Sequence, residues 1–168
     1  FVALVGLTEP LFLDIEYIKN ESIYGERIAP GSLTFGIAEG LTVQTGLIHG
    51  TGLAFAGLDR MRLFGPVKVG DTVQVEIEVL DTKPVPQRGG GIVRYRQWVK
   101  NQRGETIMEY DVARLIRGEG SGGQGSEHQV GAGGVHCTSR LATCPLGVPR
   151  IVVRSRWRRC TFGAPRQW

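Results

Sequence analysis

The sequence predicts an α+β fold in which an antiparallel sheet wraps around one central helix, and two observations support this prediction. Residues 33–48 form a long apolar segment that is rich in small residues and has Glu39 as its one acidic or basic side chain. A helix that is apolar nearly all round must be buried on most sides. Four extended segments follow it, and separate runs of helix and strand are typical of an α+β domain.

The segment before the central helix contains short helices with recognisable ends. Residues 1–6 are expected to form the last turns of an amphipathic helix, and Pro10 disfavours helix at Glu9. Asp14 is expected to cap a short helix over residues 15–20. Ser32 follows Pro30 and Gly31, and we expect it to cap the central helix.

Strands are predicted over residues 52–64, 71–82, 91–101 and 105–117. The second strand alternates apolar residues with polar ones, which indicates one buried face and one wet face. Its apolar set is Val73, Val75, Ile77 and Val79. The third strand alternates in the same way and places Val93, Tyr95, Gln97 and Val99 on one face.

The chain divides into a domain of residues 1–117 and a Gly-rich, basic tail of residues 118–168. Residues 1–118 carry 13 basic and 14 acidic side chains, whereas residues 119–168 carry seven Arg and two Glu. The basic charge is therefore a property of the tail, and it does not predict nucleic-acid binding. The tail is expected to be disordered. A sharper hypothesis is that it is not native protein sequence.

Some kinds of site and location are not indicated. The three cysteines all lie in the tail, at spacings that match neither a metal knuckle nor a redox pair, so no metal site is expected. No apolar run approaches about 20 residues, so no membrane span is expected, and the cytoplasm is the default location.

Four motifs then carry a resemblance to the MaoC-like hydratase and dehydratase family. Residues 1–14, FVALVGLTEPLFLD, resemble the family segment F-A-x-L-S-G-D-x-N-P-L-H-x-D. Residues 24–41, YGERIAPGSLTFGIAEGL, resemble F-G-x-x-I-A-H-G-x-L, and residues 63–79 resemble F-x-x-P-V-x-x-G-D-T-V. Residues 101–115 fit the closing hairpin, N-x-x-G-E. The resemblance implies a hot-dog fold over residues 1–117, with the family's first strand missing upstream of Phe1.

The resemblance also implies a function. The family hydrates or dehydrates acyl-CoA thioesters, with CoA as part of the substrate and no separate cofactor. The resemblance further implies a homodimer or heterodimer that holds the acyl chain in a tunnel at the dimer interface. The thioester carbonyl is expected near the start of the central helix, where Gly31 stands at the position of the family's oxyanion N–H.

The departures from the motif concern the reaction itself. The motif positions for the catalytic Asp and His hold Leu7 and Phe12, the Asn position holds Glu9, and Pro30 replaces a His. Hydration needs groups that exchange protons with water and with the substrate, and neither Leu nor Phe has one. Leu7, Phe12, Pro30 and Ser32 are therefore expected to bind substrate.

Two carboxylates are the remaining catalytic candidates. Glu39 is set in an apolar helix, where burial raises a carboxyl pKa, and hot-dog thioesterases place a carboxylate similarly. Glu9 lies beside the lost positions. Three hypotheses remain open: a hydratase with a rearranged acid–base set, a thioesterase that uses Glu39 and the Gly31 N–H, and a non-catalytic acyl-CoA-binding or heterodimer subunit.

Overall fold

The computed structural model describes residues 1–118, 137–143 and 149–155 of the 168-residue chain. Short helices α1 (Val2–Val5), α2 (Pro10–Leu13) and α3 (Ile15–Asn20) precede the long helix α4 (Gly31–Gln44). Strands β1 (Gly52–Leu63), β2 (Gln74–Val85), β3 (Gly90–Lys100) and β4 (Thr106–Arg117) follow, with the single turn η1 (Pro86–Arg88) between β2 and β3. The last two strands are β5 (Cys137–Thr143) and β6 (Pro149–Ser155).

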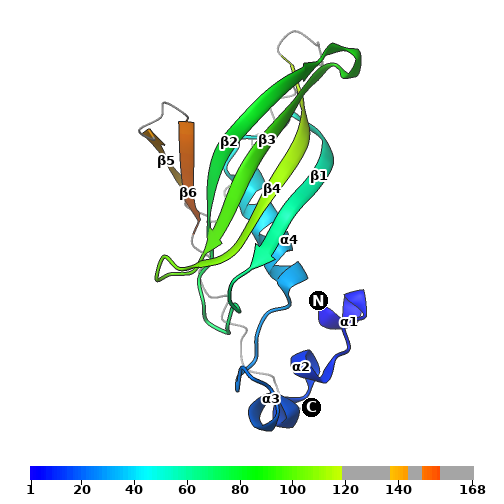
Figure 1. Cartoon of the computed structure of the whole chain (residues 1–168), viewed down its shortest axis with the longest axis vertical. Coiled ribbons are helices and arrows are strands. Elements are labelled where there is room, and N and C mark those ends of the chain that lie inside the picture. The colour runs from blue at the N-terminus through cyan, green and yellow to red at the C-terminus, as the bar shows by residue number, and fades with distance from the viewer. Residues whose placement is uncertain (119–136, 144–148, 156–168) are drawn as a thin grey trace, which may run out of the picture.

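The strands form one antiparallel sheet in the order β1-β4-β3-β2-β6-β5. Helix α4 lies along one face of this sheet, behind β1 and β4 in the view of Figure 1. Each of the four predicted strands is present with ends shifted by no more than a few residues. The predicted α+β arrangement of a sheet against one long helix is therefore confirmed.

The local signals at the N-terminal helices act as expected. Gly6 ends α1 in the left-handed region at φ 72°, and Pro10 is the first helical residue of α2. The Asp14 carboxylate accepts hydrogen bonds from the amides of Glu16 (2.9 Å) and Tyr17 (3.1 Å), which caps α3.

The start of α4 differs from the prediction. The helix begins at Gly31, one residue before Ser32, with Pro30 at the N-cap position and no side-chain cap. Ser32 is exposed within the first turn, so it is not the cap. The helix also ends at Gln44 rather than residue 48, and Gly46 follows at φ 82°, a conformation that favours glycine and interrupts the helix.

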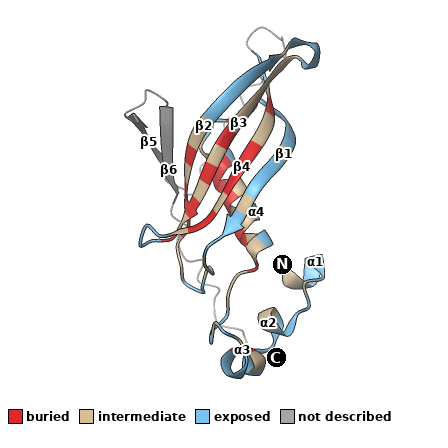
Figure 2. Cartoon of the chain, viewed as in Figure 1, coloured by how far each residue is buried: buried red, intermediate tan, exposed pale blue. Residues whose placement is uncertain are grey.

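The core lies between α4 and the central strands, as the red bands of Figure 2 show. Buried Gln97 of β3 fixes the helix on the sheet, because it donates to the Ala38 carbonyl (3.2 Å) and accepts from the Thr42 hydroxyl (2.9 Å). The remaining core residues are apolar apart from two tyrosines: Ala38, Leu41, Val73, Val75, Ile77, Tyr95, Val99, Ile107, Met108, Tyr110 and Val112.

None of the described helices and strands covers the outer face of α4, which corrects the expectation that this helix is buried on most sides. Thr34, Ala38, Leu41 and Thr42 are buried against the sheet, whereas Val43 is 43% exposed. A single sheet layer covers one side of a helix. Gly36 and Gly40 lie exposed on the uncovered side.

Two stretches of the predicted tail form strands rather than irregular chain. Strand β6 pairs with Val75–Glu78 of β2, and β5 pairs with β6. The edge of β2 presents backbone groups that an added extended segment satisfies. Residues 119–136, 144–148 and 156–168 lie outside the described residues. The hypothesis that the tail is non-native stays a prediction, which the coding DNA in its other frames tests.

Candidate functional site

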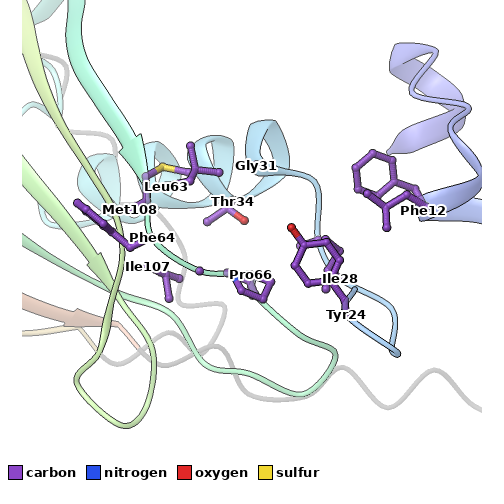
Figure 3. Close-up of a pocket in the computed structure, with 14 residues that line it drawn as sticks. Phe12, Tyr24, Ile28, Gly31, Thr34, Leu63, Phe64, Pro66, Ile107 and Met108 are labelled. Carbon is purple, nitrogen blue, oxygen red and sulfur yellow. The ribbon is translucent and has the colours of Figure 1, made fainter. Parts of the chain in front are cut away.

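A cavity of about 380 Å³ opens at the N-terminal end of α4, and we call it the front pocket. Figure 3 shows Phe12 of α2 approaching from one side, with Leu63, Ile107 and Met108 on the opposite side. The pocket is mainly apolar, which is usual for a small-molecule site. Its lining is Leu11, Phe12, Tyr24, Ile28, Ala29, Gly31, Thr34, Leu63, Phe64, Gly65, Pro66, Val67, Ile107 and Met108.

Backbone pairing holds the two walls of the front pocket together. The segment before α4 joins the segment after β1 through the Ala29 amide, which donates to the Val67 carbonyl at 2.8 Å. An isolated bridge between Ile28 and Lys68 continues this contact. The Phe64 amide donates to the Ile107 carbonyl (2.9 Å), which ties the same segment to β4. The pocket is thus formed by elements far apart in sequence.

Gly31 and Phe12, two of the residues expected in the site, line the front pocket. Gly31 is the first residue of α4, and the first N–H groups of a helix have no intrahelical acceptor. The space beside it is tight, since a Cβ at this position lies 2.7 Å from Leu63 Cδ2. The start of α4 therefore offers backbone donors to an oxygen atom in the pocket.

The other expected site residues are not part of this lining. Pro30 is buried at the N-cap of α4, and Ser32 faces solvent. Glu9 is exposed at the N-cap of α2, where it makes no side-chain capping bond. Leu7 is half-buried between α1 and α2. The described lining of the front pocket thus has no carboxylate and no histidine.

Glu39 is part of a buried polar cluster between α4 and the sheet. Its carboxylate forms an ion pair with Arg114 of β4 and accepts a hydrogen bond from the Tyr110 hydroxyl at 3.0 Å. The Arg114 guanidinium also donates to the Tyr95 hydroxyl and lies over the Phe55 ring, 5.1 Å from its centre. The Glu39 and Arg114 side chains are 15% and 13% exposed. We call these four polar residues the Glu39 cluster: Glu39, Tyr95, Tyr110 and Arg114.

The electrostatics of the Glu39 cluster follow from its burial. Burial raises the pKa of Glu39 above its ordinary value, while Arg114 and the Tyr110 hydroxyl act in the opposite direction. Burial also raises the pKa of Tyr95 and of Tyr110, and the Glu39 carboxylate adds to the effect on Tyr110. The tyrosines are therefore neutral hydrogen-bond donors or acceptors, and Glu39 has a permanent cation as its partner.

A second, smaller cavity of about 140 Å³ lies beyond the Glu39 cluster, toward the C-terminal end of α4. Thr42 and Ile48 contribute to it from the helix side, and Tyr95 and Ile116 from the sheet. On β4, Tyr110 and Arg114 lie between Met108 of the front pocket and Ile116 of this cavity. The Glu39 cluster consequently stands between the two cavities.

Sequence reasoning missed several lining residues. Tyr24 and Thr34 bring hydroxyl groups, and Leu63, Pro66 and Met108 bring apolar surface. The motif comparison contained a signal for Tyr24, since it stands where the family pattern F-G-x-x-I-A has Phe. The others come from β1, β4 and the loop after β1, and only the folded chain brings these elements to the start of α4.

Two further properties bear on the kind of site. None of the helices in the described ranges is long and apolar enough to cross a membrane. Within the same ranges, no group of three or more His, Cys, Asp or Glu side chains is arranged to hold a metal ion.

Comparison with known proteins places this geometry in a family. The family model described as "MaoC like domain" matches residues 3–101. A monoamine oxidase regulatory protein from Archaeoglobus fulgius is 35% identical, with a TM-score of 0.63 over 70% of this chain and 77% of that one. A MaoC-like dehydratase from Rhodospirillum rubrum is 30% identical, with a TM-score of 0.57 over 69% of this chain and 82% of that one.

A third solved structure agrees with these two. An (R)-hydratase from Pseudomonas aeruginosa is 29% identical, with a TM-score of 0.54 over 71% of each chain. No curated protein matches the chain. The solved structures confirm the hot-dog fold, and the family model matches more than half of the sequence. The chain therefore belongs to the MaoC-like domain family.

Proposed function

We propose that this chain binds an acyl-CoA thioester in the front pocket, with the thioester carbonyl at the Gly31 end of α4. The observation that carries the proposal is the position of the pocket, an apolar cavity of about 380 Å³ at the start of a 14-residue helix. The unpaired N–H groups of a helix start favour an oxygen that carries partial negative charge. Apolar walls suit the acyl chain, and the charged part of CoA stays outside.

The proposed role is binding without the family's usual acid–base reaction, as a non-catalytic member or as one subunit of a mixed dimer. General acid–base catalysis requires a titratable group within hydrogen-bond reach of the reacting atoms. Leu7 and Phe12 hold the positions where the family motif has Asp and His. No carboxylate or histidine belongs to the described lining of the pocket.

Catalysis by Glu39 has less support than binding. A thioesterase would need the Glu39 carboxylate free to act as base or nucleophile. Here Arg114 and Tyr110 occupy both carboxylate oxygens. A hydratase that uses Glu9 would need this exposed side chain to turn into the pocket. Both activities remain distinct outcomes of the assay described below.

A dimer is part of the proposal, because the chain exposes an apolar face that we call the open face. Strand β1 at the edge of the sheet is exposed along nearly its whole length (Figure 2). Neighbouring exposed apolar side chains are typical of interaction sites in proteins. A second copy, or a related subunit, is proposed to cover this face in a cytoplasmic complex. The open face consists of Gly36, Gly40 and Val43 of α4 and Leu53, Phe55 and Leu58 of β1.

One set of measurements on the purified chain separates the three activities. Calorimetric titration with butyryl-CoA, and with CoA alone, measures whether the acyl group contributes to binding. Loss of the enoyl absorbance of crotonyl-CoA reports hydration, and release of free thiol from butyryl-CoA reports hydrolysis. The proposal expects tighter binding of butyryl-CoA than of CoA, with neither reaction. Equal affinity for butyryl-CoA and CoA, or no binding of either, contradicts it. Sedimentation of the chain and of a Leu58→Asp variant tests the open face.

A further inference from the structure

The front pocket has very few side-chain groups that form hydrogen bonds. Among the described residues that line it, Tyr24 and Thr34 alone have polar side chains, and none is charged. An apolar cavity with few polar groups uses them to orient its ligand. These two hydroxyls are therefore the side-chain groups that can select a ligand in this pocket.

The two hydroxyls differ in their surroundings. The Thr34 hydroxyl is 3.4 Å from the Pro30 carbonyl within the first turn of α4, and Thr34 is 5% exposed. The Tyr24 hydroxyl has no hydrogen-bond partner among the described residues. Figure 3 shows the hydroxyl end of Tyr24 turned toward α4 rather than toward Phe12. Tyr24 thus presents a free donor on the helix side of the pocket.

The backbone around Tyr24 is held in place before any ligand binds. The Tyr24 amide donates to the Ser22 hydroxyl at 3.1 Å, within the loop that follows α3. Four residues later, Ile28 and Ala29 pair with Lys68 and Val67 on the opposite wall. Tyr24 is half-buried between these attachments. Ligand binding therefore immobilises few additional rotatable bonds, which lowers its entropic cost.

We infer that the Tyr24 hydroxyl is a specificity-determining group that donates a hydrogen bond to the carbonyl oxygen of an acyl thioester in the front pocket. This inference rests on the proposed function and names the residue that recognises the polar atom of the acyl group. A neutral carbonyl matches a single neutral donor. A carboxylate or phosphate would lie in this pocket without a charged partner, which is unfavourable.

Tyr24 differs from the residue that the family pattern has at its position, which supports a role specific to this chain. The family pattern F-G-x-x-I-A has Phe at the position of Tyr24. The added hydroxyl lies in the pocket that Phe12, at the position of the motif His, also lines. A hydroxyl that a bound ligand covers needs a hydrogen-bond partner in the complex, because a donor buried without one is unfavourable. The ligand oxygen gives that hydroxyl a function.

The test uses the full chain and the variant Tyr24→Phe, which removes one oxygen atom and leaves the ring. Calorimetric titration with butyryl-CoA is expected to show roughly 3- to 10-fold weaker binding, the usual effect of one neutral hydrogen bond. Binding of CoA without an acyl group is expected to be unchanged. The matched control is Tyr17→Phe on α3, which lies outside the pocket lining and is expected to bind both ligands as the parent chain does.

A second readout reports the hydrogen bond directly. Butyryl-CoA with a 13C-labelled thioester carbonyl is expected to show a lower carbonyl stretching frequency when it binds the parent chain. In Tyr24→Phe this shift is expected to be smaller. If Tyr24→Phe matches the parent in both affinity and carbonyl frequency, the role of Tyr24 is wrong while acyl-CoA binding stands. If the parent chain does not distinguish butyryl-CoA from CoA, the proposed function itself fails, and the role of Tyr24 with it.

Discussion

Glu39 on α4 and Arg114 on β4 form an ion pair in the interior, where helix and sheet face each other. Each of these charges is unusual for the surface on which it lies. Glu39 is the one acidic or basic residue of an apolar helix, and Arg114 continues the inward-facing row of Met108, Tyr110 and Val112 on β4. An unpaired charge in either place would be costly, so the two residues stabilise the fold only together.

This pairing predicts a large effect of removing one partner. Glu39→Gln is expected to lower the free energy of unfolding by about 3 kcal/mol, because it leaves the Arg114 guanidinium in the interior without an anion. Chemical denaturation of the purified chain measures this change. Glu16→Gln is the control, since Glu16 makes an exposed pair with Lys19 at 3.8 Å, and a change below about 0.5 kcal/mol is expected there.

The double variant Glu39→Leu with Arg114→Leu distinguishes the contribution of the ion pair from the cost of leaving one charge unpaired. Replacing both charges with apolar residues of similar size is expected to cost less than Glu39→Gln alone, because no buried charge remains. If Glu39→Gln instead unfolds at the same denaturant concentration as the parent chain, the ion pair contributes no net stability.

A second ion pair is linked to a strained backbone position. Arg60 has φ 52°, in the left-handed region, at a bulge of β1 between Asp59 and Arg62. Its side chain binds the Asp111 carboxylate on the face of the sheet opposite α4. Arg60→Gly removes the ion pair but relieves the backbone. Arg60→Ala removes the ion pair and keeps the strain.

We expect Arg60→Gly to be more stable than Arg60→Ala by about 1 kcal/mol, the usual difference between glycine and other residues in this conformation. Thermal and urea unfolding of both variants measures it. Arg62 gives a control of opposite sign. Arg62 is exposed, pairs with Glu109 at the end of the bulge and has no positive φ, so Arg62→Gly is expected to be less stable than Arg62→Ala. The same order at both positions would contradict the strain at Arg60.

The pH dependence of stability is predicted from Asp111. Its side chain is 1% exposed, and the hydrogen bonds from Arg96 hold the pKa of its carboxyl below the ordinary value, with help from Arg60. A carboxyl whose pKa is lower in the folded state stabilises the fold above its unfolded pKa of about 3.9. That stabilisation is lost as the pH falls through the lower folded value.

The free energy of unfolding of the parent chain is therefore expected to exceed that of Asp111→Asn by a constant amount near neutral pH. This difference is expected to shrink once the pH falls below about 4. Urea unfolding at a series of pH values checks this. Asp81→Asn provides the comparison, because Asp81 pairs with Arg94 at 3.2 Å where both side chains are about half exposed. A margin for Asp111→Asn that does not change with pH would be inconsistent with a lowered pKa.

The strands and the inward faces of this fold were predictable because they depend on local alternation. Val75 and Ile77 on β2, and Tyr95 and Val99 on β3, are buried as the period of two indicates. The exposure of α4 was not predictable in this way. The small residues Gly36 and Gly40 on the outer side of α4 are compatible with cover by a sheet of the same chain or by another subunit, so the sequence does not distinguish the two.

The site was predictable only where a motif marked it. Phe12 and Gly31 lie in the front pocket, and both came from motif positions. The partners of Glu39 were missed because they lie 71 and 75 residues away on β4. The one sequence signal for this pair was the position of Arg114 on β4, where strand alternation points it to the same face as the apolar residues. A lone charge of each sign on two facing apolar surfaces indicates a pair, but the facing of α4 and β4 is known only after folding.

The backbone N–H of Gly31 leads to the last prediction, which rests on the proposed function. Gly31 is the first residue of α4, where proline is well tolerated in helices. Pro30 before it has ψ 144°, an extended conformation that a following proline accepts. Gly31→Pro therefore removes the N–H while the helix start is preserved. Any Cβ at this position meets Leu63 Cδ2 at 2.7 Å, so the added atoms need a control.

Gly31→Ala is that control, because it adds the same Cβ and keeps the N–H. We expect Gly31→Pro to bind butyryl-CoA roughly 3- to 10-fold more weakly than Gly31→Ala, as calorimetric titration measures. CoA without an acyl group is expected to bind both variants equally, since its phosphates remain outside the pocket. Equal affinity of the two variants for butyryl-CoA would exclude the Gly31 N–H as a ligand of the thioester oxygen. Recognition of that atom would then depend on the side-chain hydroxyls of the front pocket, Tyr24 and Thr34.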